Sequence, residues 1–277
     1  MQPSFRFLKP ENENTNIKKL RNIMLTISYD GSNYHGWQIQ KNALTVQEVF
    51  QNALFKIIKE NVDIKGCSRT DTGVHAKMYV ISFKTHSNIA PKNLVLALNK
   101  LLPNDIAALE GKEVPEDFHA RYSCSSKEYI YKIWHSKIKN PFLNNRALHY
   151  WYPLDIKELN SAAKYFVGAH DFTSFCAQDK RKMENMVRNI EYFEVYRSKD
   201  DENMVEFKVK ADGFLYNMVR IMIGTLLRVA QGKIKKEDIP KITECKDRSK
   251  AGPTVPAKGL YLNKVYYQNS KVGEKLI

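Results

Sequence analysis

The chain has 277 residues, of which 44 are Lys or Arg and 30 are Asp or Glu, so its formal net charge is +14. Hydrophobic residues make up 43% and charged residues 27%, which excludes a disordered chain, a collagen-like repeat and a coiled coil. No apolar run approaches the roughly 18–20 residues of a membrane span, and the basic excess predicts a polyanionic partner, nucleic acid first and a membrane surface second.

Residues 1–22 are polar and carry Lys18, Lys19 and Arg21, which predicts a basic N-terminal arm. They contain neither the apolar stretch nor the cleavage site of a secretory signal, so we expect a cytoplasmic protein. The four cysteines stand at 67, 124, 176 and 245, without CxxC spacing or pairing with histidine. We therefore expect reduced thiols, with no disulfide framework and no zinc site.

Residues 23–122 predict an N-terminal α+β subdomain. Thr45 is a suitable N-cap for a helix whose apolar residues recur at helical spacing to Ile58, and Pro91 suits the first turn of a second helix. Apolar runs predict strands at 23–28, 62–67, 77–85 and 106–114. The order strand, helix, strand, strand, helix, strand is the split βαβ plan of ferredoxin-like and RNA-recognition-motif folds.

Residues 123–268 repeat this plan more loosely and predict a C-terminal α+β subdomain, followed by a tail at 269–277. The expected elements are a strand at 127–135, a helix at 156–168, a hairpin of strands 187–198 and 203–211, a helix at 214–232 and a strand at 258–267. The predicted fold class is therefore α+β, with two ferredoxin-like subdomains whose sheets join and which share one active-site cleft.

The segment GCSRTDTGVHA at 66–76 places several polar side chains between two apolar strands. An ordinary Asp-containing turn explains it on spacing alone, because Asp, Thr and Gly favour turns. The functional alternative is a carboxylate, Asp71, that acts as nucleophile or base, with Arg69 available for a phosphate. A serine hydrolase is disfavoured because Ser68 lacks the GxSxG elbow.

Tyr129 and Tyr131 fall on one face of the strand at 127–135. Such residues are ordinarily half-buried packing aromatics. On the sheet of a basic protein they can instead stack on nucleobases. The residues alone leave both interpretations open.

Arg220 lies within NMVRIMIGTLL, a helical segment that is apolar on most sides. A buried arginine needs a carboxylate or phosphate partner, whereas one at the edge of the apolar face extends its head group to water. Gly224, one turn later, would let a backbone or a ligand approach closely.

The remaining positive charges include two clusters in loops. Each cluster alone is typical of a solvent-exposed surface, whereas the two together could form a surface that binds the phosphates of an RNA backbone. One cluster holds Lys180, Arg181, Lys182 and Arg188, and the other holds Lys233, Lys235 and Lys236. No P-loop, GxGxxG or metal-ligand spacing occurs, so we expect no cofactor and no metal.

Taken jointly, six motifs in order resemble one family closely, the tRNA pseudouridine synthases of the TruA type. They are YDGSNYHGWQIQ (29–40), SRTDTGVHA (68–76), FHARYSCSSKEYIYKIW (118–134), GAHDFTSF (168–175), NMVRIMIG (217–224) and KGLYL (258–262). The resemblance implies isomerisation of uridine to pseudouridine at positions 38–40 of the tRNA anticodon stem-loop, without cofactor or metal. It also implies a homodimer, with tRNA as partner and no membrane.

By the same resemblance, the essential aspartate falls on Asp71, the active-site tyrosine on Tyr129 and the active-site arginine on Arg220. Arg69 would help to hold the target nucleotide out of the stack. This chain departs from the usual pattern at Thr72, where the family has alanine, and at Ser68, where it has glycine.

The chemistry of these residues agrees with that role. The target nucleotide must leave the helical stack, at a cost of a few kcal/mol. Asp71 can attack C1′ or remove a proton from C2′, and an ion pair with Arg220 is expected to keep it ionised. Tyr129 can stack on the uracil and assist proton removal from C5. A non-catalytic RNA-binding protein on the same scaffold is the alternative, although it would need no such trio.

Overall fold

The computed structural model describes residues 19–177 and 185–267. The expected arm is therefore described only from Lys19 onward, and its residues Arg21 and Asn22 already belong to the first strand. The expected tail at 269–277 lies outside the described residues, as do Lys180, Arg181 and Lys182.

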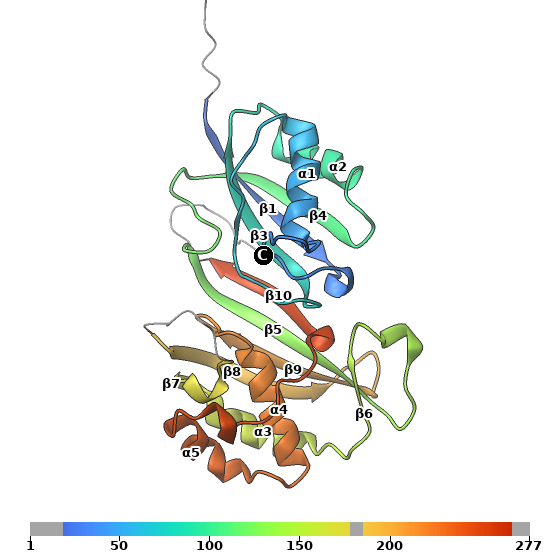
Figure 1. The fold of residues 1–277 in the computed structure, drawn as a ribbon, viewed down its shortest axis with the longest axis vertical. Coiled ribbons are helices and arrows are strands. Elements are labelled where there is room, and N and C mark those ends of the chain that lie inside the picture. The colour runs from blue at the N-terminus through green and yellow to red at the C-terminus, as the bar shows by residue number, and fades with distance from the viewer. Residues whose placement is uncertain (1–18, 178–184, 268–277) are drawn as a thin grey trace, which may run out of the picture.

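One sheet of ten strands runs through both halves of the molecule (Figure 1). The strands are β1 (Arg21–Tyr29), β2 (Lys65–Gly66), β3 (His75–Thr85), β4 (Ile106–Val114), β5 (Cys124–His135), β6 (Leu148–Tyr150), β7 (Gly168–Asp171), β8 (Val187–Arg197), β9 (Met204–Ala211) and β10 (Leu260–Tyr267). The α-helices are α1 (Val46–Ile58), α2 (Pro91–Asn99), α3 (Ile156–Ala163), α4 (Met218–Ala230) and α5 (Ile239–Glu244). None of the helices in the described parts is long and apolar enough to cross a bilayer.

The strand order is β4-β1-β3-β10-β5-β9-β8-β7, with β2 paired to β3 and β6 paired to β5. The first half has the order β4-β1-β3-β2, and the second half repeats it as β10-β5-β9-β8. Each half is therefore a ferredoxin-like unit, and the predicted α+β fold class is confirmed. The connection between the halves runs from the end of β4 at Val114 to the start of β5 at Cys124.

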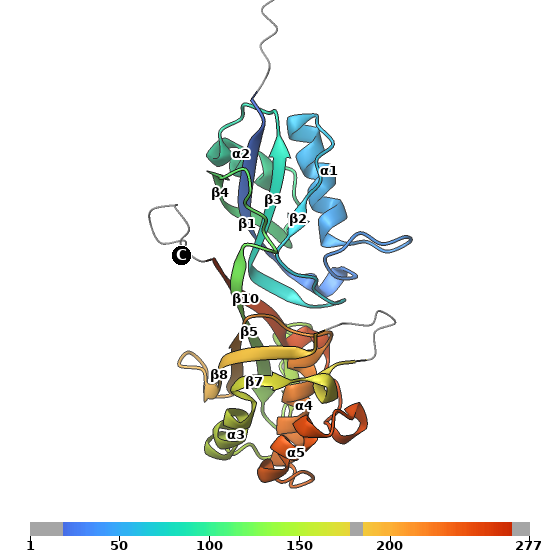
Figure 2. The ribbon, with the colours of Figure 1, turned by 90° about the vertical axis from the view of Figure 1, so that its left-hand side faces the viewer.

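The two halves meet where β10 lies parallel to the start of β3, close to the waist of the molecule (Figure 2). Only two residue pairs form this ladder, Tyr261 with His75 and Leu262 with Ala76. On its other edge β10 pairs with β5 along almost its whole length. The start of β3, which directly follows the Asp71 loop, is thereby attached to the second half.

Two predicted elements differ from the structure. The strand expected at 62–67 is reduced to Lys65–Gly66, because only these residues pair with β3. The helix expected at 214–232 begins at Met218, because Asn217 has a left-handed backbone with φ of 60° and breaks the helix before it. Residues 214–216 are consequently free to line a cavity.

Smaller differences concern the ends of elements. Helix α3 ends at Ala163 and continues as a 3-10 turn, Lys164–Phe166, before Gly168 enters β7 with φ of 106°. By contrast, α1 begins as expected, because the Thr45 hydroxyl accepts a hydrogen bond from the backbone N–H of Glu48 at 3.4 Å.

Candidate active site

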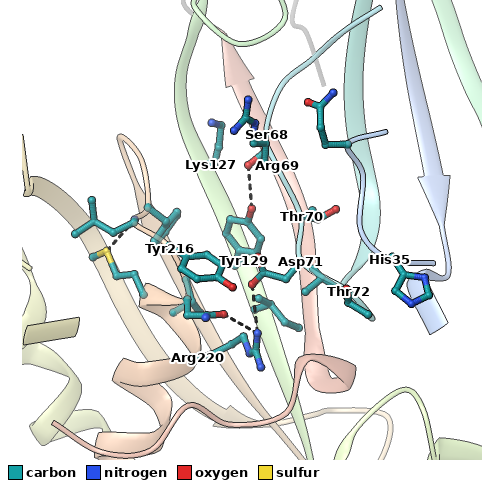
Figure 3. Close-up of a pocket in the computed structure, with 18 of the residues that line it drawn as sticks. His35, Ser68, Arg69, Thr70, Asp71, Thr72, Lys127, Tyr129, Tyr216 and Arg220 are labelled. Carbon is teal, nitrogen blue, oxygen red and sulfur yellow. Dashed lines mark hydrogen bonds and ion pairs between the residues drawn. The ribbon is translucent and has the colours of Figure 1, made fainter. Parts of the chain in front are cut away.

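A cavity of about 730 Å³ lies at the junction of the two halves (Figure 3). It is lined by the loop between β2 and β3, by β5, and by the segment that leads into α4. Its volume is within the usual range for sites that hold small molecules or nucleotides, about 300–1,000 Å³. Asp71 from the first half and Tyr129 and Arg220 from the second half all line it.

Asp71 and Arg220 form an ion pair across this cavity, with 3.2 Å between Arg220 Nη1 and Asp71 Oδ2. The arginine also donates from Nε to the carbonyl of Val255 at 2.8 Å and from Nη1 to Asn217 Oδ1 at 2.6 Å. Its side chain is 16% exposed and that of Asp71 is 29% exposed. The pair is therefore partly buried, and of the two alternatives that the sequence left open for Arg220, the arginine with a carboxylate partner is the one observed.

The backbone around Arg220 depends on the glycine one turn further along α4. A Cβ atom at Gly224 would lie 1.8 Å from the carbonyl oxygen of Pro253, so no larger residue fits. The close approach that the sequence predicted is made by this chain's own backbone, not by a ligand. It places Val255 where its carbonyl accepts from the arginine, and its N–H donates to the Arg220 carbonyl at 3.4 Å.

Burial raises the pKa of the Asp71 carboxyl, and the charge and hydrogen bond of Arg220 lower it by less, so the net pKa is above the usual value for an aspartate. Arg220 thus favours the ionised form, in the direction that the sequence predicts, but burial has the larger effect on the pKa. A carboxylate that is held partly out of water is a stronger base than a solvated one.

Tyr129 lies on β5 and is 6% exposed, with its ring edge-on to Phe214 at a centroid distance of 5.2 Å. Its hydroxyl shares a hydrogen bond of 3.3 Å with Ser68 Oγ, from the same loop as Asp71. Burial raises the pKa of this phenol above its ordinary range, so it is neutral. Tyr131 is fully buried and donates to the carbonyl of Pro256, so this second tyrosine is a packing residue.

Arg69 lies at the end of the cavity opposite Arg220, next to Lys127 (Figure 3). Arg121 also lines the cavity. Within the described part of the chain, no salt bridge joins Arg69, Arg121 or Lys127 to a carboxylate. These three cations are therefore available to phosphates.

The motif at 29–40 holds the Asp71 loop in place. Tyr29 bonds its hydroxyl to Thr70 Oγ1 at 2.8 Å, and the backbone N–H of Trp37 donates to the Thr70 carbonyl at 3.2 Å. Gly36 has φ of 83°, and a Cβ atom there would lie 2.3 Å from that same carbonyl oxygen. Two motifs that are separate in the sequence thus form one rigid unit around the carboxylate.

Sequence reasoning did not single out several residues of the cavity. Arg121 and Lys127 belong to the motif at 118–134, and His35 belongs to the motif at 29–40. These motifs pointed to the family, but the spacing of the three residues within them did not mark them as part of a site. Tyr216 lines the cavity because the helix starts later than periodicity suggests. Among the described residues, no cluster of three or more His, Cys, Asp or Glu side chains could hold a metal ion.

Comparison with known proteins decides the family. The family model described as tRNA pseudouridine synthase matches residues 25–123 and 162–268. A tRNA pseudouridine synthase A from Ruminiclostridium cellulolyticum is 50% identical over 248 residues, which are 90% of this chain and 100% of the relative. Namesakes from Thermoanaerobacter sp. and Clostridium acetobutylicum are 46% and 47% identical with the same coverage.

The chain belongs to the tRNA pseudouridine synthases. The resemblance carried by the six motifs is confirmed, as is the assignment to a family of isomerases. The alternative of a non-catalytic RNA-binding protein finds no support in these comparisons. Tyr129 falls in the stretch 124–161 that the family model leaves unmatched, whereas Arg69, Asp71 and Arg220 fall within the matched ranges.

Proposed function

We propose that this protein converts uridine to pseudouridine at positions 38–40 of the tRNA anticodon stem-loop, as a cytoplasmic homodimer and without a cofactor. The observation that carries the proposal is the Asp71–Arg220 ion pair, which faces Tyr129 across one cavity in a member of this family. Each half of the chain contributes part of this set, so the site requires both.

The first step of the proposed reaction is extrusion of the uridine from the stem-loop. The reacting atoms C1′ and C5 are inaccessible in a stacked helix, and extrusion costs a few kcal/mol. Arg69 is exposed at the end of the cavity remote from Arg220. There its guanidinium can bind the displaced backbone and hold the nucleotide out.

In the second step the bond between N1 of uracil and C1′ of the ribose breaks. Asp71 acts either as a nucleophile that forms an ester at C1′, or as a base that removes the proton from C2′. In the first case the ester bond is broken when C5 bonds to C1′, and in the second case Asp71 returns the proton to C2′. Both routes need the ionised carboxylate, which Arg220 stabilises at 3.2 Å.

In the last step the proton on C5 must leave and N1 must gain one, so that product and substrate are isomers. Tyr129 can stack on the uracil and keep it in the cavity while it turns over. Because burial keeps its phenol neutral, we assign it a relay role in which it donates one proton as it accepts another. Ser68, at 3.3 Å, is the polar group that shares its hydroxyl hydrogen bond.

The proposal is tested by measuring tritium release from tRNA labelled at C5 of uridine. Pseudouridine formation must release this tritium, because C5 loses its hydrogen when it bonds to C1′, whereas binding alone releases none. We expect release with the wild-type protein. Asp71→Asn should abolish it while the Kd for tRNA stays within a few-fold, because the substitution keeps the shape of the side chain. Appreciable release by a clean Asp71→Asn preparation would refute the role of Asp71.

A further inference from the structure

A second cavity, of about 270 Å³, lies beside the segment that connects β5 to α3. Its lining includes Trp134, Lys139, Asn140, Asn144, His149 and Lys258. All but Lys258 belong to the stretch 124–161 that the family model leaves unmatched. None of these six residues takes part in the Asp71 site.

The polar groups of this cavity have hydrogen-bonding capacity to spare. His149 donates from Nε2 to the carbonyl of Ser136 at 2.9 Å, which leaves Nδ1 as an acceptor in the neutral ring. Asn140 uses its Oδ1 to accept from the backbone N–H of Phe142 at 3.0 Å, which leaves its amide nitrogen as a donor. In the described part of the molecule, neither Lys139 nor Lys258 has a carboxylate in salt-bridge range.

The surrounding segment at 136–152 is basic and aromatic. It contains Lys137, Lys139 and Arg146 and no Asp or Glu. Phe142 is 87% exposed and Trp151 is 57% exposed. Arg146 pairs with Asp30, with 3.1 Å between Nε and Oδ2, whereas Lys137 and Lys139 have no salt bridge in the described part of the chain. Exposed aromatics beside such cations are typical of surfaces that bind a nucleic-acid strand, because bases stack on the rings and phosphates pair with the cations.

The second cavity is close enough to the first for one RNA strand to occupy both. Lys258 lines the second cavity and Leu260 lines the first, and two residues of extended chain span at most about 7 Å. His75, four residues after Asp71, reinforces this proximity. Its Nε2 lies 3.0 Å from the carbonyl of Asn145 and 3.1 Å from that of Lys258.

We propose that this second cavity binds another nucleotide of the same tRNA, a few residues along the strand from the flipped uridine. Lys139 and Lys258 pair with its phosphates, and the amides of Asn140 and Asn144 with His149 Nδ1 contact the edge of its base. The inference rests on the proposed function and adds a second subsite for the same substrate.

The test compares Lys139→Ala/Lys258→Ala with a matched double variant, Lys92→Ala/Lys164→Ala. Lys92 and Lys164 are exposed, lie on α2 and on the turn after α3, and line neither cavity. The Kd for an unmodified tRNA transcript is measured at several salt concentrations. Each phosphate contact that is lost should reduce the slope of log Kd against log salt by about 0.7–0.9, so the first pair should reduce it by roughly 1.4–1.8.

We further expect Asn144→Ala to raise the Kd for tRNA at least three-fold with an unchanged salt slope. The uncharged amide is proposed to bond to the edge of a base, and only contacts between cations and phosphates contribute to the salt slope. A Kd and slope for Lys139→Ala/Lys258→Ala equal to those of the control pair would overturn the phosphate assignment. A wild-type Kd for Asn144→Ala would overturn the base contact.

The catalytic proposal and this one fail separately. Tritium release by the wild-type protein tests the reaction, whereas the Kd series tests the second subsite whether or not release occurs. For an active protein, the Lys139→Ala/Lys258→Ala variant should raise KM and leave kcat within two-fold. A fall in kcat at saturating tRNA, with KM unchanged, would place these lysines in the reaction step and contradict the subsite.

Discussion

Replacement of Arg220 by alanine should reduce both stability and turnover. The variant removes the guanidinium from Asp71, Asn217 and the carbonyl of Val255, which it reaches at 3.2, 2.6 and 2.8 Å. Breaking a fully buried ion pair costs about 3–5 kcal/mol. Because the two charged side chains are 16% and 29% exposed, water compensates part of that loss, and we expect about 2 kcal/mol.

A loss of about 2 kcal/mol corresponds to a fall in Tm of roughly 4–8 °C for a protein near this size. Arg228→Ala is the matched control, because Arg228 lies two turns later on α4 and its side chain has a single hydrogen bond among the described residues, from Nη1 to Gln231 Oε1 at 3.4 Å. Turnover should fall because the Asp71 carboxylate loses its counter-charge. An unchanged Tm for Arg220→Ala, measured beside Arg228→Ala, would show that the ion pair does not form in solution.

Three further predictions concern the loop around Asp71. Burial raises the pKa of Asp71 in the folded state, so the folded protein keeps the proton to higher pH, and ionisation of Asp71 costs stability as pH rises through that window. The Tm of Asp71→Asn relative to wild type should therefore rise as the pH goes from below the ordinary aspartate pKa to neutrality, and a Tm difference that does not change with pH would contradict this cause. Ser68→Gly removes the 3.3 Å partner of Tyr129 and should lower kcat several-fold with little change in Tm, whereas wild-type kcat would exclude Ser68 from the relay. Gly36→Ala places a Cβ 2.3 Å from the Thr70 carbonyl at φ of 83°, so activity should collapse, and an active variant would show that the loop tolerates displacement.

The elements that could be predicted from the sequence are those whose apolar periodicity agrees with the local backbone. The strand predicted at 106–114 has the same first and last residues as β4, and Thr45 caps α1 as expected. The start of α4 could not be predicted, because the left-handed conformation of Asn217 is a property of one residue that periodicity does not register. Arg121 and Lys127 were missed for another reason: charged residues on a strand or loop show no pattern until the fold sets them around a cavity.

The direction of the pKa shift of Asp71 also could not be predicted from the sequence. An ion pair with Arg220 predicts a lowered pKa, and burial predicts a raised one. Only the three-dimensional surroundings decide that burial prevails. The residues of the site could be proposed from motifs, but the energetic balance between them depends on how far each side chain is withdrawn from water.

The joint between the two halves explains why so much of the motif sequence lies away from the reacting groups. Asp71 belongs to one half and Arg220 to the other, so their 3.2 Å contact depends on how rigidly the halves are held. Two residue pairs between β3 and β10 are a short ladder for that purpose. His75 strengthens it, because the buried imidazole stacks on Tyr261 at 4.5 Å, accepts from the backbone N–H of Gly31 at 3.1 Å and bonds to carbonyls of the second half. Gly31 belongs to the motif at 29–40 that holds the Asp71 loop, and His75 lies on the strand after Asp71. The His75 side chain therefore connects this motif and β3 to the second half of the molecule. The geometry of the ion pair between Asp71 and Arg220 depends on this connection.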